Sequence, residues 1–286
     1  MTAEISAFLH PGSSTWSYVL ADPAAGRAAV IDPVLDYDAP SGRTGTASAE
    51  VLVDHVRRKG WTLDWILETH AHADHLTAAQ YVKQRLGGKV AIGEGIRKVQ
   101  QTCKTLFNLG AEFEPDGSQF DHLFRDGESF RIGGLPVRVM ATPGHTSDSV
   151  AYLVDGAAFV GDTLFMPDSG TARADFPGGD AGQLYDSIHR LLALPETTHL
   201  YMCHDYGQGG RPHADHASVA EQRKANVHVK DGVTREEYVK LRQARDATLP
   251  VPALLLPALQ VNVRAGRLPE PESDGVAYLK IPLDRV

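Results

Sequence analysis

Short apolar runs bounded by turn residues alternate with segments of helical periodicity along most of the chain. The runs at residues 15–20 and 28–32 are separated by a segment with proline and glycine, residues 22–26, and so predict a pair of strands joined by a turn. In residues 47–59 the apolar positions have helical spacing and Gly60 follows directly, which predicts a helix that ends at residue 59.

The same two patterns continue to residue 247. Strands are predicted at residues 66–67, 89–92, 129–132, 136–141, 150–154, 157–161 and 199–203, and helices at residues 76–86, 94–109, 180–194, 217–226 and 235–247. The tail from residue 249 to residue 286 is rich in proline, which predicts an irregular segment with one short strand near residues 278–280. Two strand-rich halves, each followed by helices, predict an α/β fold in which two mixed sheets pack face to face with helices outside.

The composition narrows the class of protein. The 286 residues are 42% hydrophobic and 22% charged, which fits one large domain, alone or with a small appendage. A net charge of -8 with no block of Lys or Arg argues against nonspecific nucleic-acid binding. No apolar run approaches the roughly 20 residues that span a bilayer, and the first residues lack the pattern of a signal peptide. Since only Cys103 and Cys203 are present, we predict a cytoplasmic protein without disulfides or membrane contact.

Side chains that bind metals are concentrated directly after the apolar run at residues 65–67. His70, His72, Asp74 and His75 lie within six residues, and imidazole and carboxylate groups are ligands for zinc, iron and manganese. The alternative is a polar loop that is rich in histidine by chance. At the end of a strand these side chains would point into one small space, which predicts a metal site.

Three further residues of ligand type, His145, Asp162 and His204, each lie at the exit of a predicted strand. A lone histidine there is more often a hydrogen-bonded polar residue than a ligand, but a whole set at strand exits favours a metal centre. Glycine precedes His145 and Asp162, which allows the backbone to approach the site closely. We therefore interpret the chain as a metalloenzyme.

These motifs carry a family resemblance. The order His70-x-His72-x-Asp74-His75, then His145, Asp162 and His204, resembles the metallo-β-lactamase fold superfamily over about residues 5–210. Asp32, which ends a predicted strand, resembles that superfamily's first motif, a supporting carboxylate near the site. The resemblance implies an αββα sandwich with metals at one edge of the two sheets. It divides the chain into a catalytic domain, residues 1–210, and a helical and proline-rich extension, residues 211–286, packed on the same domain.

Narrower motifs resemble one branch of the superfamily, the persulfide dioxygenases related to the ethylmalonic encephalopathy protein. They are Thr171-Ala172-Arg173-Ala174-Asp175-Phe176, His204-Asp205-Tyr206 and Asn262-Val263-Arg264-Ala265-Gly266. Residues 165–170 and 257–262 are similar to bacterial members named β-lactamase-like hydrolases. The resemblance implies an Fe(II)-dependent oxidation of glutathione persulfide with O₂ to sulfite and glutathione, a reaction of sulfide detoxification.

The same resemblance implies roles for single residues. One Fe(II) per chain would be held by His70, His145 and Asp162, which leaves open positions for substrate and O₂. His72 and Asp74 would orient the ligands and bound water, and Tyr206 would hydrogen-bond the substrate. Arg173 and Arg264 would bind the carboxylates of glutathione. For Arg173, an ion pair with Asp175 or its neighbours is the open alternative.

A second metal is the main competing interpretation. Asp74, His75 and His204, with Asp162 as a bridge, would hold it, and two zinc ions would then support a hydrolase of the glyoxalase II or lactonase type. A non-catalytic metal-binding scaffold is a third hypothesis, which the intact ligand set disfavours. Relatives often form homodimers, but the sequence identifies no interface.

Two other features are interpreted as structural. The segment Pro212-His213-Ala214-Asp215-His216 is predicted to begin a surface helix, with Asp215 or Ser218 as cap, and not to bind metal. Cys203 is interpreted as a small buried hydrophobic residue at a strand end. Because neither cysteine lies in a loop typical of sulfur carriers, the persulfide would arrive on a small thiol or a partner protein.

Overall fold

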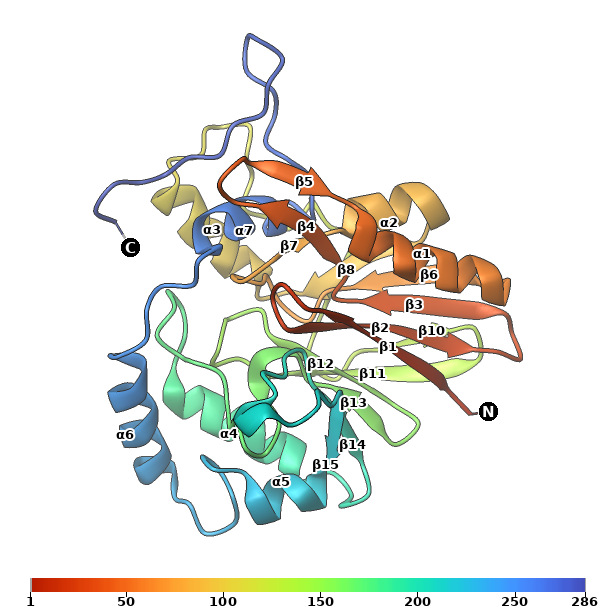
Figure 1. Cartoon of the computed structure of the whole chain (residues 1–286), viewed down its shortest axis with the longest axis vertical. Coiled ribbons are helices and arrows are strands. Elements are labelled where there is room, and N and C mark those ends of the chain that lie inside the picture. Colours follow the sequence, from red (N-terminus) through yellow and green to blue (C-terminus); the bar gives the residue numbers. More distant parts are fainter. Residues whose placement is uncertain (1, 286) are drawn as a thin grey trace.

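The computed structural model describes residues 2–285, in which two six-stranded sheets lie between helices (Figure 1). The first sheet contains, in spatial order, β1 (Glu4–His10), β2 (Thr15–Asp22), β3 (Arg27–Ile31), β6 (Thr62–Leu67), β8 (Lys89–Gly93) and β9 (His122–Phe124). Strands β1, β2 and β3 pair antiparallel, whereas β3, β6, β8 and β9 pair parallel. The sheet is therefore mixed, as predicted.

The second sheet is also mixed. It contains β10 (Ser129–Ile132), β11 (Leu135–Ala141), β12 (Val150–Val154), β13 (Ala157–Phe159), β14 (His199–Tyr201) and β15 (His216–Ser218). Only β13 and β14 pair parallel. A small third sheet joins β5 (Arg43–Gly45), β4 (Val34–Asp38) and β7 (Leu76–Thr77).

Helices cover the outer faces of both sheets (Figure 1). They are α1 (Ala47–Lys59), α2 (Ala79–Leu86), α3 (Ile96–Leu106), α4 (Ala181–Leu192), α5 (Val219–Ala225), α6 (Arg235–Asp246) and α7 (Leu255–Asn262), with two short 3₁₀ turns, η1 (Gly161–Thr163) and η2 (Gln208–Gly210). Helices α1 and α2 lie on the first sheet, α4 and α5 on the second, and α6 packs against α4.

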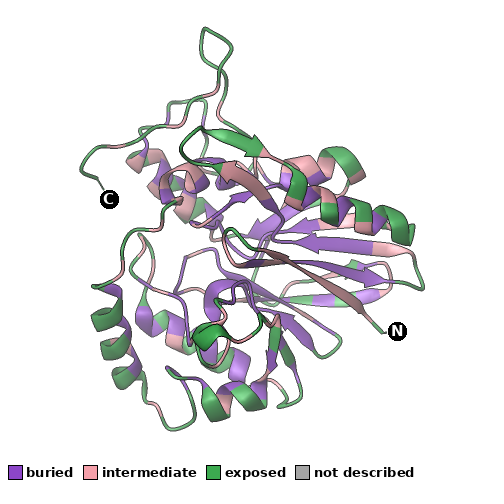
Figure 2. Cartoon of the chain, in the orientation of Figure 1, coloured by how far each residue is buried: buried purple, intermediate pink, exposed green. Residues whose placement is uncertain are grey.

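Alternation along the strands produces the separate layers of the core. In β3, Ala29 and Ile31 face the second sheet, whereas Ala28 and Val30 face the helices on the opposite side. Because successive side chains of a strand point to opposite faces, an apolar strand supplies two layers at once. The inner strands of both sheets, such as β3 and β12, are accordingly buried, the edge strand β1 is partly exposed, and the helices expose one face (Figure 2).

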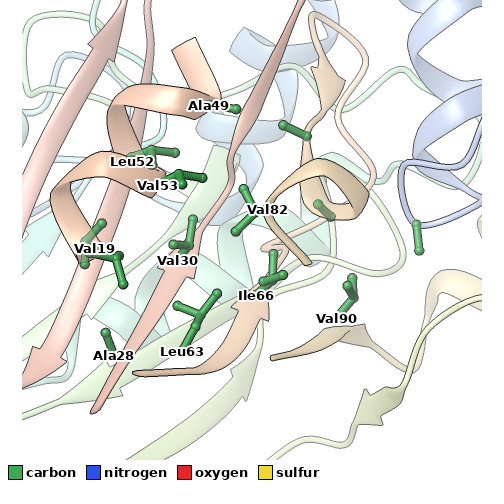
Figure 3. Close-up of a cluster of buried hydrophobic side chains, with 14 of the residues drawn as sticks. Val19, Ala28, Val30, Ala49, Leu52, Val53, Leu63, Ile66, Val82 and Val90 are labelled. Atoms are coloured by element: carbon green, nitrogen blue, oxygen red, sulfur yellow. The ribbon is translucent and has the colours of Figure 1, made fainter. Parts of the chain in front are cut away.

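The layer between the first sheet and its helices shows how α1 is held. Leu52 and Val53 of α1 point toward Val19 and Val30 of the sheet, and Val82 of α2 adjoins them (Figure 3). Gly60 ends α1 in the left-handed conformation with φ of 69°, which glycine adopts without a steric penalty. The bounds predicted for this helix are confirmed.

Two predictions about the C-terminal tail are wrong. Residues 255–262 form helix α7, and no strand occurs near residues 278–280 among the described residues. Pro257 does not prevent the helix because it lies in the first turn, where its missing N–H is not needed for an intrahelical hydrogen bond. At Lys280 the backbone N–H bonds the side chain of Gln260 instead of a neighbouring strand.

The segment before α5 also differs from its prediction. Residues 216–218 form the edge strand β15, so no helix begins at residue 212. The helix begins after Ser218, whose hydroxyl accepts a hydrogen bond from Glu221 N–H in a capping box, which confirms Ser218 as a cap.

The boundary at residue 210 stays a prediction, although β15 lies beyond it and still belongs to the second sheet. Among residues 2–285, no helix is long and apolar enough to cross a membrane.

Candidate metal centre

The predicted ligands lie on loops at the ends of strands from both sheets. His70, His72 and His75 follow β6 of the first sheet. His145 follows β11 of the second sheet, Asp162 lies in η1 after β13, and His204 follows β14.

The glycines beside two of these ligands are required by close packing. Gly161 has φ of +53°, and a Cβ there would lie 2.7 Å from Thr69 Oγ1. A Cβ on Gly144 would lie 2.2 Å from Leu184 N. Both distances are shorter than real Cβ contacts, so a larger residue would displace Asp162 or His145 from the site.

His70, His145 and Asp162 form one compact buried group, with their ligand atoms within 4.8 Å of one another. Asp162 Oδ2 lies 3.8 Å from His70 Nε2 and 3.5 Å from His145 Nε2. These separations are long for direct hydrogen bonds, and they suit atoms that share a bound cation. The structure therefore brings the three predicted iron ligands together.

Asp162 also belongs to a second group, with Asp74 and His204. His204 Nε2 lies 3.3 Å from Asp162 Oδ1 and 3.5 Å from Asp74 Oδ2. The two oxygens of Asp162 thus face different groups. His75 gathers instead with His72 and Asp74, and its Nδ1 lies 3.2 Å from Asp74 Oδ2.

Several buried polar atoms of these groups have no hydrogen-bond partner among residues 2–285. They are His70 Nε2, both ring nitrogens of His72, His75 Nε2 and Asp162 Oδ1. An unsatisfied buried polar atom destabilises the fold by about 1–3 kcal/mol. A group of such atoms at one place is therefore unfavourable unless a ligand binds them. A divalent cation would satisfy nitrogen and carboxylate donors together. The donor set fits a metal ion.

The electrostatics of the histidines agree with this role. Burial, reinforced by neighbouring imidazoles, holds the pKa values of His70 and His72 well below the usual value. Both rings are therefore neutral near pH 7 and keep the lone pair that a metal requires. Burial disfavours charge on His204 as well, but the Asp162 and Asp74 carboxylates outweigh it and raise its pKa to about 10.

Hydrogen bonds orient the two histidines of the first group. His145 Nδ1 donates to the carbonyl of Arg173 at 2.7 Å, which leaves Nε2 facing Asp162. His70 Nδ1 lies 3.0 Å from Thr69 Oγ1, which in turn donates to Asp32 Oδ2 at 2.8 Å. This chain assigns the proton of His70 to Nδ1 and the lone pair to Nε2. Asp32 thus lies near the site as a supporting carboxylate.

Asn262, at the end of α7, holds the ligand loop from the opposite side. Its Nδ2 donates to the carbonyls of His72 and His75, each at 2.8 Å, and its Oδ1 accepts from Thr77 N–H at 2.8 Å. Asn262 belongs to one of the motifs of the predicted family, but no role for it was predicted from the sequence. The one feature of the sequence that could have indicated its role is the polar amide of Asn262 at the end of an apolar segment.

The site opens into a pocket of about 510 Å³, which is lined by Asp74, His145, Asp162 and His204 of the candidate ligands. Phe165 and Phe176 form apolar walls, and residues 249–253, here called the proline strap, form one side. A second pocket of about 730 Å³, across the strap, also reaches Asp74 and His75. The strap therefore separates two approaches to the metal centre.

The residues predicted to bind substrate are placed differently from one another. Tyr206 lines the pocket, half exposed, with its ring stacked on His204 at 6.0 Å between centroids. Arg173 lines it too, but its guanidinium pairs with Asp175 at 2.6 and 2.8 Å and donates to Pro250 O at 2.7 Å. The ion pair that was the open alternative is therefore present.

Arg264 is not part of this pocket. Its guanidinium lies over the ring of Phe113, 4.7 Å from the centroid, and donates to Gln260 O. It lines a separate cavity of about 350 Å³ on the side of the C-terminal tail. The motif around Asn262 therefore supports the metal loop through Asn262, whereas Arg264 lies outside the pocket at the metal group, and its role in substrate binding stays a prediction.

Comparison with known proteins places the chain in a family. The profile of the Metallo-beta-lactamase superfamily matches residues 10–204. A probable metallo-hydrolase of Burkholderia pseudomallei is 53% identical over 99% of both chains. A beta-lactamase hydrolase-like protein of Agrobacterium fabrum is 54% identical over 98% of this chain, which spans 64% of that protein.

Persulfide dioxygenases are more distant relatives. Mitochondrial persulfide dioxygenase ETHE1 of Homo sapiens is 29% identical over 90% of this chain and 86% of its own length. The crystal structure of ETHE1 from Myxococcus xanthus superposes with a TM-score of 0.74 and 31% identity, covering 92% of this chain and all of that one. The predicted fold and the predicted relationship are confirmed, and the chain belongs to the metallo-beta-lactamase superfamily of metal-binding enzymes.

Proposed function

We propose that the protein is an Fe(II)-dependent persulfide dioxygenase, which converts glutathione persulfide, O₂ and water to glutathione, sulfite and two protons. The observation that carries the proposal is the oriented group of His70, His145 and Asp162, of which His145 and Asp162 line the pocket. Two imidazoles and one carboxylate on one side of an ion are typical of non-haem iron oxygenases. When bound there, Fe(II) would supply redox chemistry with O₂ at its open positions.

The arrangement of the remaining ligands supports a single-metal centre. The predicted second set was Asp74, His75 and His204, but His75 gathers with His72 instead of with His204. In addition, His204 Nδ1 lies 3.3 Å from Ser14 O and 3.4 Å from Thr15 Oγ1, so its ring is less firmly oriented than that of His145. Of the two groups that share Asp162, the first has the shorter orienting hydrogen bonds to its histidines.

The pocket residues account for the rest of the work on substrate. Burial, followed by the Asp162 and Asp74 charges, raises the pKa of Tyr206, so its hydroxyl stays protonated and can donate a hydrogen bond at the pocket mouth. Phe165 and Phe176 exclude water from the neighbourhood of the reacting sulfur. The similarity of the chain to persulfide dioxygenase ETHE1 of Homo sapiens and to the structure of ETHE1 from Myxococcus xanthus supports this proposal.

A dinuclear zinc hydrolase of the glyoxalase II or lactonase type is the second candidate. The observation that favours it is Asp162, whose two oxygens face the two separate ligand groups as a bridging carboxylate would. The related probable metallo-hydrolase of Burkholderia pseudomallei bears a name of this class.

Metal content and turnover separate the two candidates. Protein reconstituted anaerobically with Fe(II) should bind one iron per chain, consume O₂ with glutathione persulfide and release one sulfite per O₂. Zinc-loaded protein, tested with S-lactoylglutathione and a lactone, should show no comparable turnover. Two metals per chain, together with thioester or lactone hydrolysis and no sulfite, would overturn the dioxygenase proposal in favour of the hydrolase.

A further inference from the structure

Three arginines line the pocket above the metal centre: Arg173, Arg242 and Arg245. Arg173 is committed to Asp175 and to the strap carbonyl of Pro250. Arg242 is buried in α6, where its guanidinium pairs with Asp246 at 2.9 Å and donates to Thr171 O at 3.1 Å. Both guanidinium groups therefore hold the wall of the pocket together.

Arg245 differs from the other two. It lies in the last turn of α6, one turn beyond Arg242, and is exposed. Within residues 2–285 its side chain forms no ion pair and no hydrogen bond, although it lines the same pocket as Asp162 and His145. Its charge also helps to lower the pKa of His228, after burial and Arg242, which places it close to that wall.

Charge distinguishes the two pockets on either side of the proline strap. The pocket across the strap is lined by Asp36, Asp38 and Asp74, with Arg43 as its one arginine, whereas the pocket of Arg245 is lined by Asp74, Asp162 and three arginines. The carboxylates of Asp175 and Asp246 are paired with the other two arginines, Arg173 and Arg242. In a chain with a net charge of -8, a free guanidinium at the mouth of one pocket attracts anions to that side.

We propose that Arg245 is the residue that recognises a carboxylate of the thiol substrate and so determines specificity for an anionic peptide thiol. A guanidinium binds a carboxylate through two parallel hydrogen bonds, and the absence of a protein partner leaves both available. The volume of about 510 Å³ is in the range that small-molecule pockets have, with room for a tripeptide thiol between α6 and the metal group. The inference rests on the proposed function in taking glutathione persulfide as the substrate.

Arg245 lies at the pocket mouth and does not belong to the ligand group, so it acts on the substrate's tail and not on the reacting sulfur. An interaction that is equal in the ground state and the transition state changes KM and leaves kcat unchanged. The signature of this role is therefore a KM effect that depends on the presence of a carboxylate in the substrate.

The experiment compares Arg245→Gln and Arg245→Lys with Lys240→Gln, which removes the same charge from an exposed position of α6 outside the pocket. Steady-state O₂ uptake is measured with glutathione persulfide and with 2-hydroxyethyl persulfide, which has no carboxylate. Loss of a charge-assisted hydrogen bond predicts that Arg245→Gln raises KM for glutathione persulfide about tenfold or more. We expect Arg245→Lys to recover part of this loss in KM. For the Arg245 variants, kcat with either persulfide and KM for 2-hydroxyethyl persulfide should match wild type. Lys240→Gln should match wild type in all of these values.

Titration calorimetry with reduced glutathione keeps the inference separate from the reaction. If wild type consumes O₂ with neither persulfide, the proposed function fails. The role of Arg245 in carboxylate binding is still supported in that case if Arg245→Gln weakens glutathione binding about tenfold and Lys240→Gln does not. Equal KM values for wild type and Arg245→Gln would overturn the inference. So would an equal loss with both persulfides, or no glutathione binding by a wild type that consumes O₂. Metal content and melting temperature of each variant report whether it is folded.

Discussion

His70 and His145 reach the same oxygen of Asp162 through different supports. His70 is fixed by Thr69 and, through it, by Asp32, whereas His145 is fixed by the backbone carbonyl of Arg173. Each support bonds Nδ1 and leaves Nε2 for the metal, which is how an outer hydrogen bond selects the tautomer of a ligand. The site is therefore arranged for a metal at the level of single atoms.

Removing one of these ligands should remove the metal. We expect His145→Ala to lose bound iron and to lower O₂ uptake by more than about 100-fold, since a ligand change exceeds the effect of an outer hydrogen bond. Iron content by elemental analysis and O₂ uptake measure the two effects. His189→Ala, which alters an exposed histidine of α4 that lies outside the pocket, is the control and should match wild type. Retained iron with full activity in His145→Ala would refute the ligand assignment.

At the scale of elements, the ligand loop after β6 depends on α7. Asn262 makes three hydrogen bonds to that loop, and it is buried. A helix almost 190 residues further along the chain thus sets the path of the backbone that carries His72 and His75. The proline strap lies just before α7, so one segment of the chain both supports the metal loop and borders the pocket.

We expect Asn262→Ala to weaken iron binding about 10- to 100-fold and to destabilise the fold by about 2–4 kcal/mol, because buried groups of the loop lose their partners. Competition with a chelator measures the first effect and urea unfolding measures the second. Gln260→Ala on the same helix removes hydrogen bonds to Leu256 and Lys280 only. It should lower stability and leave iron affinity unchanged; equal iron affinity in both variants would contradict the role of Asn262.

Arg173 connects the pocket wall to the strap. Arg173→Ala removes the hydrogen bond to Pro250 O and the pair with Asp175, so the strap should lose its fixed position. We expect kcat/KM to fall about tenfold for glutathione persulfide and for 2-hydroxyethyl persulfide alike. Arg190→Ala, at an exposed ion pair with Asp126, is the matched control. A KM change confined to glutathione persulfide would instead assign Arg173 to carboxylate binding.

At the scale of the whole molecule, stability depends on polar groups buried between helices and loops. His228, outside the metal group, accepts a hydrogen bond from Thr171 N–H through Nδ1 and therefore must be neutral. Burial, then the charges of Arg242 and Arg245, lowers its pKa to about 4. Since the unfolded chain binds this proton near the ordinary histidine pKa of 6.5, folding stability falls as pH decreases from about 6.5 to about 4.

This linkage predicts a loss of about 2–3 kcal/mol from His228 alone between pH 7 and pH 4. His228→Asn keeps an acceptor near the position of Nδ1 but cannot titrate. Urea unfolding of metal-free protein at both pH values should therefore show a smaller pH dependence for the variant than for wild type, by about that amount. Identical pH dependence in the two proteins would show that His228 is protonated without cost.

The local sequence pattern was sufficient to predict an element wherever residues that are neighbours in sequence determine its conformation. Helix α1 ends at Gly60 as predicted, because the apolar spacing and the left-handed cap are both local. A metal site was predictable for a similar reason, since ligand-type residues follow apolar strands and strand ends of packed sheets meet at one edge; the set of His70, His145 and Asp162 came from the family resemblance. Helix α7 was missed because the prolines around it indicate a break unless the first turn of the helix is known to contain one of them.

The sequence by itself determined that this chain folds as two packed sheets with a metal centre at their strand ends. The reason is that the apolar strands and the ligands that follow them can each be recognised within a short segment of sequence. Only the tertiary structure decided which arginines lie in the pocket beside that centre. Arg264 belongs to a motif of the predicted family, yet packing places its guanidinium over Phe113. Arg245 belongs to no motif, yet α6 places it at the pocket mouth. The physical reason is that long-range packing, and not local spacing, sets the direction of a side chain.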